Sequence, residues 1–171
     1  MKRDDAAAAL RDLHARVDRR ASELAVHHSQ RLHCARGCHA CCVDDLTVFT
    51  IEADRIRASH AALLRGGTPH PAGACAFLGG EGECRIYPDR PYVCRTQGLP
   101  LRWLDEDDAG AVRELRDICP LNLDGPALES LPEDVCWSIG PVERELGEIQ
   151  DAQDDARVKR IALRSLFERS G

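Results

Sequence analysis

The stretch Cys34-Ala-Arg-Gly-Cys38-His-Ala-Cys41-Cys42 holds four of the chain's nine cysteines. In the C-x2-C turn from Cys38 to Cys41, two thiolates can converge on one metal ion, which is why this spacing recurs in zinc knuckles. Adjacent residues project in different directions, so Cys41 and Cys42 most easily serve two metal ions, or one polynuclear centre reached from two sides. The stretch therefore predicts a fold organised around more than one metal ion.

Five more cysteines follow at wider spacing: Cys75, Cys84, Cys94, Cys119 and Cys136. Four ligands complete a tetrahedral zinc site and four cysteines hold a common iron–sulfur cluster, so eight thiolates would fill two closed sites. Cys136 is left over, and we expect it to act as a small buried hydrophobic side chain. The predicted metal ligands are Cys34, Cys38, Cys41, Cys42, Cys75, Cys84, Cys94 and Cys119.

Charge and hydropathy limit the function and location of the chain. Its 171 residues contain 23 Lys and Arg against 29 Asp and Glu, a formal net charge of −6 that disfavours general binding to nucleic acid. Residues 1–17 are charged and rich in alanine, unlike a signal peptide or a membrane anchor. We therefore expect a cytoplasmic protein. Thiols stay reduced in that compartment, so the cysteines are expected to bind metal rather than form disulfides.

A long helix is predicted on each side of the cysteine-rich centre. Apolar residues that step by three or four predict a helix over residues 5–32. Pro141 suits the first position of a second helix, whose apolar stripe continues through Ala156 towards the C-terminus. We expect the two helices to pack on each other. A dimeric coiled coil is the alternative, although Gly147 interrupts the stripe and regular heptads are missing.

The predicted fold class is mainly α, with a small irregular α+β, cysteine-rich metal-binding centre between the long N- and C-terminal helices. One domain is expected, with an N-terminal helix (1–33), a cysteine-cluster core (34–125) and a C-terminal helical region (126–171). Because only 4% of the residues are aromatic, bound metal is expected to supply part of the folding energy. The smaller predicted elements are a helix over 51–64 capped by Thr50, a loop over 65–76, a strand over 84–87, and a β-hairpin with arms at 99–104 and 111–118.

The cysteine pattern resembles a known family. The run at 34–42, the segment Cys75-x-Phe-Leu, and Cys84-Arg-Ile-Tyr-x-x-Arg-Pro-x-x-Cys94-Arg are together similar to the YkgJ-type cysteine-cluster family, also called the CxxCxxCC zinc- or iron-chelating domain family. The similarity covers residues 30–125, although three residues rather than two separate Cys34 from Cys38. The resemblance implies a metal-chelating domain, and a related branch includes flagellin lysine N-methylases.

Arginines and histidines close to the cysteines are further candidates for the site. Arg90 and Arg95 flank Cys94, where they could donate hydrogen bonds to metal-bound sulfur, and a solvated surface position is the alternative. His33 and His39 adjoin the first cluster, and either could complete a mixed site. The other histidines are expected at the surface: His14, His27, His28, His60 and His70.

We predict a metal-binding protein with a structural or metal-handling role, holding about two zinc ions, with iron or an iron–sulfur cluster as the alternative. The C-x3-C-x2-C spacing also occurs in radical S-adenosylmethionine enzymes, so an iron–sulfur enzyme related to these or to lysine N-methylases is the alternative function. The strand–helix alternation of such an enzyme does not follow residue 45. The expected partners are metal ions, with a protein partner as a further option, and the expected state is a monomer or homodimer without contact to membrane or nucleic acid.

Overall fold

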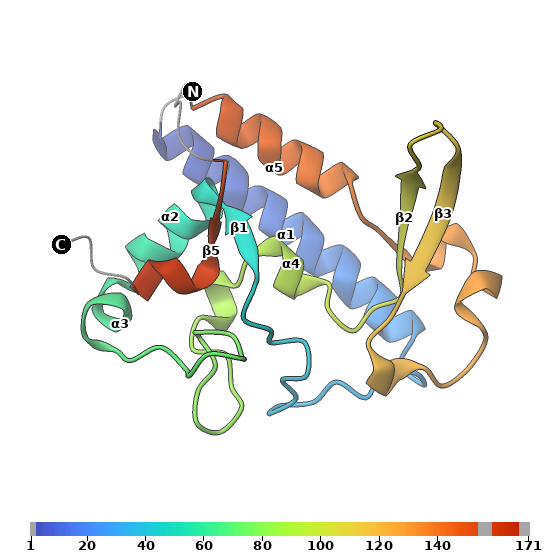
Figure 1. Cartoon of the computed structure of the whole chain (residues 1–171), viewed down its shortest axis with the longest axis horizontal. Helices are drawn as coiled ribbons and strands as arrows, with labels where there is room; N and C mark the ends of the chain where they lie inside the picture. The colour runs from blue at the N-terminus through green and yellow to red at the C-terminus, as the bar shows by residue number, and fades with distance from the viewer. Residues whose placement is uncertain (1–2, 154–158, 168–171) are drawn as a thin grey trace.

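The longest helix, α1 (Arg3–His27), buries one face along the rest of the chain (Figure 1). The computed structural model describes residues 3–153 and 159–167. The side chains of Leu10, Leu13 and Val17 are at most 2% exposed, and steps of three and four residues place them on one face of a helix. The predicted N-terminal helix is therefore confirmed, although it ends several residues before position 32.

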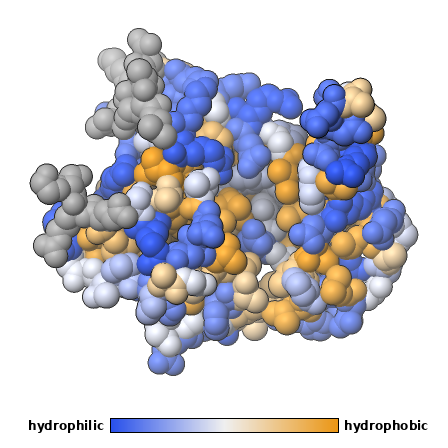
Figure 2. All heavy atoms as spheres, in the orientation of Figure 1, coloured by the Kyte–Doolittle hydropathy of each residue, from blue (hydrophilic) through white to orange (hydrophobic). Residues whose placement is uncertain are grey.

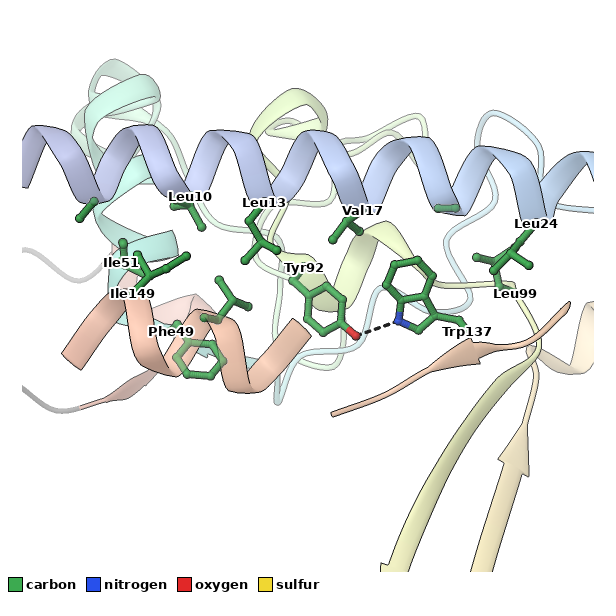
Figure 3. Close-up of a cluster of buried hydrophobic side chains, with 13 residues drawn as sticks. Leu10, Leu13, Val17, Leu24, Phe49, Ile51, Tyr92, Leu99, Trp137 and Ile149 are labelled. Carbon is green, nitrogen blue, oxygen red and sulfur yellow. Dashed lines mark hydrogen bonds between the residues drawn. The ribbon is translucent and has the colours of Figure 1, made fainter. Parts of the chain in front are cut away.

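Helix α5 (Pro141–Asp151) packs along α1, as predicted for the two terminal helices. Between them lie Tyr92 of the short helix α4 (Tyr92–Arg95) and Trp137 of strand β4 (Trp137–Ser138). The indole N–H of Trp137 donates to the Tyr92 hydroxyl at 2.8 Å (Figure 3). This bond lets two large aromatic side chains enter the core without an unpaired polar atom at the point where they meet.

A second hydrophobic cluster lies beneath the cysteine-rich loops. Strand β1 (Thr47–Phe49) pairs antiparallel with β5 (Arg160–Ala162), and α2 (Thr50–Ser59) and α3 (Ala61–Gly66) follow β1. Phe77 and Ile56 are fully buried in this cluster and Leu163 is 3% exposed. The predicted helix over 51–64 is thus two helices, separated at His60, where the backbone leaves the helical conformation.

The predicted β-hairpin is confirmed. Strands β2 (Leu101–Glu106) and β3 (Val112–Asp117) pair antiparallel, and β4 adds to β2 in parallel, so the sheet order is β3-β2-β4. The carboxylate of Asp107 accepts hydrogen bonds from the backbone N–H groups of Ala109 and Ala111, each at 2.9 Å. An aspartate that bonds to the backbone two residues later is a common way to close a turn.

The C-terminal region departs from the prediction. Helix α5 ends at Asp151, and the chain returns as β5 and a 3-10 segment rather than as more helix. Ile161 and Leu166 lie where the helical stripe was predicted to continue, but they pack in the second hydrophobic cluster, because pairing with β1 decides the conformation of this apolar segment. Ala156, which was placed on the same stripe, lies outside the described residues.

The fold is a mixed α+β arrangement rather than a mainly α one. The segment 84–87 forms no strand: Cys84 makes an isolated bridge with Leu78, and a 3-10 turn follows. Proline and glycine in this part of the chain limit regular pairing. The 3-10 segments are Tyr87–Asp89, Pro120–Asn122, Leu128–Ser130, Glu133–Val135 and Leu163–Phe167.

Most of the molecular face in Figure 2 is hydrophilic, with apolar residues in separate patches. The large exposed apolar side chains come from different elements, including Val26 of α1, Leu104 of β2 and Leu123. Scattered exposure of this kind is normal for folded proteins. Among the described helices, none has the length and apolar character needed to cross a bilayer.

Candidate metal centre

Seven cysteines line one cavity of about 580 Å³. The first cluster supplies four of these thiols, and the second group supplies the other three from separate turns. The shared cavity brings together cysteines up to sixty residues apart in the chain. The seven cysteines are Cys34, Cys38, Cys41, Cys42, Cys75, Cys84 and Cys94.

Tight turns shape the first cluster. The backbone N–H of Cys38 donates to the carbonyl of Ala35, and that of Cys42 donates to the carbonyl of His39, both at 2.9 Å. Within the first turn, Gly37 has φ +88°, a conformation that side-chain-bearing residues rarely adopt. The two turns therefore direct several thiols into the same cavity within a short length of chain.

Backbone hydrogen bonds join the second group to the first. The N–H of Cys75 donates to the carbonyl of Cys42 at 2.8 Å. Cys84 bridges to Leu78, and the N–H of Arg85 donates to the carbonyl of Phe77 at 2.9 Å. Main-chain contacts thus tie Cys75 to the first cluster and tie Cys84 to the segment that follows Cys75.

The thiols of the cavity differ in acidity. A hydrogen bond from the Cys42 thiol lowers the pKa of Cys41 to about 6, whereas the same interaction raises the pKa of Cys42. Burial raises the pKa of Cys75 and Cys84, and it raises the pKa of Cys94 to about 12. Most of these thiols therefore hold their protons at neutral pH, and a metal ion has to displace protons to bind them.

The donor set fits a thiophilic metal. Sulfur ligands select zinc, copper(I) or iron–sulfur clusters over hard cations such as magnesium. Across residues 3–153 and 159–167, no three Cys, His, Asp or Glu side chains already converge closely enough to hold an ion. Binding therefore requires the sulfurs to close in around the metal, which loops of this kind can do more readily than helices.

Cys119 and Cys136 do not line the cavity. Cys119 precedes the 3-10 segment Pro120–Asn122 and is half-buried. Cys136 is 5% exposed, and its sulfur lies 3.9 Å from a guanidinium nitrogen of Arg116. Neither these two thiols nor the other seven form disulfides; all nine cysteines lie in the described part of the chain.

Arg90 and Arg95 both line the cavity. The Arg90 guanidinium lies 4.0 Å from the centre of the Tyr87 ring and donates to the Tyr87 carbonyl at 3.1 Å. The Arg95 side chain is 2% exposed and donates to the Pro88 carbonyl at 3.2 Å. The sequence left two environments open for these arginines, beside the metal-bound sulfur or solvated at the surface. Arg95 is buried, so the solvated position does not apply to it.

Comparison with known protein families finds a match over the cysteine-rich part of the chain. The sequence model of CxxCxxCC, described as a putative zinc- or iron-chelating domain, matches residues 33–120, which is just over half of the chain. The chain belongs to the CxxCxxCC family. The matched segment contains all seven cysteines of the cavity and Cys119. No curated protein and no solved structure matches the chain.

Membership of the CxxCxxCC family confirms the resemblance seen in the sequence and supports metal chelation by this chain. Two residues beyond the matched segment nevertheless shape the centre. The fully buried Asn122 donates from its amide to Cys34 Sγ at 3.3 Å and to the Gly98 carbonyl at 2.9 Å. Its amide oxygen accepts from the backbone N–H of His33 at 2.8 Å, so Asn122 fixes the start of the first cluster.

Arg164 is the second such residue, and it was not predicted as part of the site. Its guanidinium bonds to Asp44, which lies two residues after the cysteine doublet, and this contact lowers the pKa of the Asp44 carboxyl. It also donates to the carbonyls of His70 at 2.8 Å and Ala74 at 2.7 Å. Arg164 therefore joins the C-terminal segment to the loop that leads into Cys75. Sequence spacing gives no signal for a contact over this separation.

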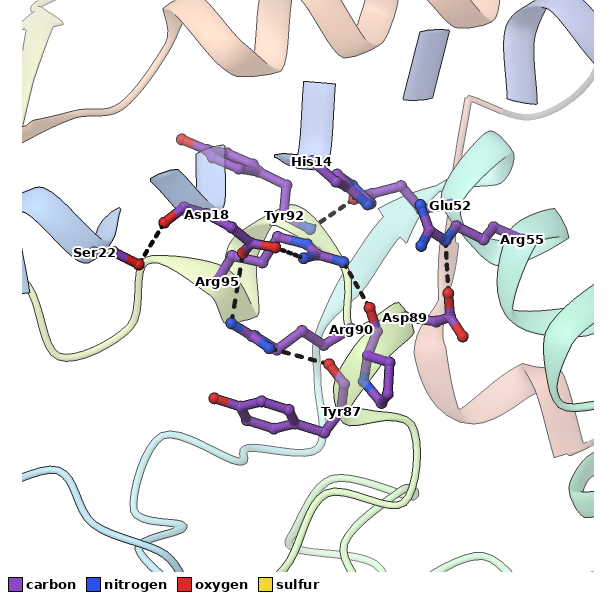
Figure 4. A network of polar contacts seen from close by, with 11 residues as sticks. His14, Asp18, Ser22, Glu52, Arg55, Tyr87, Asp89, Arg90, Tyr92 and Arg95 are labelled. Atoms are coloured by element: carbon purple, nitrogen blue, oxygen red, sulfur yellow. Dashed lines mark hydrogen bonds and ion pairs between the residues drawn. The ribbon is translucent and has the colours of Figure 1, made fainter. Parts of the chain in front are cut away.

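The histidines of the CxxCxxCC chain differ partly from expectation. His14 is 2% exposed and lies 3.1 Å from the Glu52 carboxylate, and burial lowers its pKa (Figure 4). His28 is also buried and bonds to the Val135 carbonyl at 2.7 Å. Both were expected at the surface and that expectation is wrong, because they lie on the buried face of α1 or just after its end. Neither His33 nor His39 lines the cavity.

Proposed function

We propose that the CxxCxxCC domain binds two zinc ions in one centre made by the seven cysteines of the cavity. The observation that carries the proposal is the single cavity, which unites thiols from both cysteine groups. Zinc in structural sites takes four ligands in a tetrahedron. Seven thiolates satisfy two such ions when one thiolate bridges both. Cys119, which was predicted as one of eight ligands, lies outside this set.

The proposed role is structural or metal-handling, in the cytoplasm or another reducing compartment. The loops that carry the ligands have little regular secondary structure, with only the short helix α4 around Cys94. Ligation by these loops would link the segments around Cys38, Cys75, Cys84 and Cys94 at one point. In small metal-binding domains such links provide folding free energy that a limited core does not.

An iron–sulfur enzyme is the second candidate. The cavity volume of about 580 Å³ lies in the range of small-molecule sites, so a substrate could share it with a metal cluster. Against radical S-adenosylmethionine chemistry, the described strands form only a two-stranded and a three-stranded sheet. A brown protein with iron and sulfide after purification without air would support this candidate and contradict zinc; a colourless protein with about two zinc ions per chain would support the primary proposal.

Cysteine variants test which thiols bind the metal. We expect Cys41→Ala and Cys84→Ala to lower the zinc content of the purified protein, because both thiols line the cavity. Cys119→Ala and Cys136→Ala are the matched controls, and both should retain the full zinc content. Elemental analysis of the four variants, purified in parallel, measures this directly. Unchanged zinc in Cys41→Ala and Cys84→Ala, or loss of zinc in both controls, would contradict the seven-cysteine centre.

Zinc affinity is expected to rise with pH. Burial raises the pKa values of Cys75, Cys84 and Cys94, so these thiols are protonated in the metal-free chain at neutral pH. When zinc displaces one proton on binding, its apparent affinity falls about tenfold for every unit by which the pH is lowered. Chelator-competition titrations at several pH values between about 6 and 8 measure the slope. An affinity that does not change over this range would mean that the buried thiols are not ligands.

A further inference from the structure

We infer that Asp18 of α1 is a positioning residue for the metal centre, acting through Arg90 and Arg95. This inference rests on the proposed function. Helix α1 lies before the segment that matches the CxxCxxCC family, and nothing in the cysteine pattern points to it. The structure nevertheless places one of its carboxylates between the two arginines that flank Cys94 (Figure 4).

Each oxygen of the Asp18 carboxylate meets a different guanidinium. Oδ2 accepts a hydrogen bond from Nη1 of Arg95 at 2.6 Å, and Oδ1 lies 3.6 Å from Nη2 of Arg90. Among the described residues, the structure places no other carboxylate within ion-pair distance of these two arginines. Asp18 therefore fixes both cationic groups from one point on the helix.

Burial makes Arg95 depend on this contact. Its side chain is 2% exposed, and burial lowers its pKa. A buried guanidinium needs a partner, because removal of the partner leaves an uncompensated charge away from water. The Pro88 carbonyl accepts one hydrogen bond from Arg95, but it supplies no charge. Without Asp18, we expect Arg95 to leave its position in the cavity wall.

The positive charges of Arg90 and Arg95 indicate how their placement affects the metal centre. Seven thiolates outweigh two divalent ions, so the proposed centre is anionic when loaded. Arg90 and Arg95 both line its cavity, and they carry two positive charges against the single negative charge of Asp18. The wall therefore keeps a net positive charge that favours deprotonated, metal-bound sulfur. Asp18 therefore holds the two guanidinium groups in the cavity wall, and its own negative charge reduces their combined charge from two to one.

The experiment compares zinc affinity in Asp18→Ala, Asp18→Asn and the unaltered chain by competition with a chromophoric chelator. Loss of a residue that orients metal ligands from outside the coordination sphere typically weakens metal binding 10- to 100-fold. We expect a loss of about that size for Asp18→Ala. Asp18→Asn keeps an acceptor oxygen for Arg95 and should lose less. Cobalt(II) loading adds a second readout, since the sulfur-to-cobalt absorption bands report the ligand arrangement and should shift in Asp18→Ala.

Glu145→Ala is the matched control, because Glu145 of α5 forms an exposed ion pair with Arg16 of α1, the helix that carries Asp18. This variant should bind zinc and cobalt as the unaltered chain does. Equal affinity and spectra for Asp18→Ala and Glu145→Ala, or an Asp18→Asn variant as weak as Asp18→Ala, would overturn the positioning role while the metal centre stands. An unaltered chain that binds no metal would overturn the proposed function and this inference together.

Discussion

Removal of zinc with a strong chelator is expected to abolish the cooperative thermal unfolding of the chain. A structural zinc ion contributes on the order of ten kcal/mol in small domains, whereas the total stability of a folded domain is about 5–15 kcal/mol. The segments around Cys38, Cys75 and Cys84 have mostly irregular backbone, so the loss falls first on them. The hydrophobic contacts of α1 with α5 do not depend on the cysteines.

Thermal unfolding followed by far-ultraviolet circular dichroism, with and without chelator, measures this effect. Hydrogen exchange locates it: amide protection should fall in residues 33–46 and 74–96 more than in α1. Restoring zinc should restore both signals, which controls for irreversible damage by the chelator. An unfolding curve and exchange pattern that are the same with and without chelator would show that metal does not organise the fold.

The substitution Glu52→Ala is expected to destabilise the chain by about 2 to 5 kcal/mol. The Glu52 carboxylate is buried and accepts hydrogen bonds from the Tyr92 backbone N–H at 2.6 Å and the Phe49 N–H at 3.4 Å. It also lies 3.1 Å from Nε2 of His14, whose pKa burial lowers, so His14 is neutral at neutral pH. Alanine leaves these buried groups without an acceptor, and each costs about 1–3 kcal/mol.

Chemical denaturation of the zinc-loaded protein measures the free energy of unfolding of this variant. The control is Glu23→Ala, which removes the exposed Arg20–Glu23 pair on α1. Exposed pairs of this kind contribute about 0–1 kcal/mol, so the control should unfold nearly as the unaltered chain does. If Glu52→Ala and Glu23→Ala have the same effect, the buried carboxylate does not join α1, α2 and α4 as the contacts indicate.

Local patterns in the sequence predicted the elements that depend on neighbouring residues. The apolar spacing of Leu10, Leu13 and Val17 gave the buried face of α1, and the acidic turn around Asp107 gave the hairpin. Both patterns involve residues that are close together in the sequence, so they can be recognised without the tertiary structure. The C-terminal segment shows the opposite case. Ile161 pairs with Val48 over more than a hundred residues, and this contact overrides the helical period of the segment.

The candidate centre was predictable only in part, because the sequence shows which side chains are present but not how they lie in space. The thiols themselves and the flanking Arg90 and Arg95 are visible in the sequence. The exclusion of Cys119 from the cavity is not, because Cys119 differs from the other thiols only in its position in space. The contacts of Asp18 and Asn122 were not predicted either, since aspartate and asparagine side chains are usually solvated.

By itself, the sequence determined the chemistry of this protein: sulfur donors, two arginines beside Cys94, and a composition that disfavours nucleic acid. Ligand type is a property of each side chain and needs no fold to be recognised. The tertiary structure alone decided which seven thiols share a cavity, that His14 is buried beside Glu52, and that Asp18 pairs with the buried Arg95. Those outcomes depend on contacts between distant segments, which follow from packing of the whole chain and leave no periodic trace in the sequence.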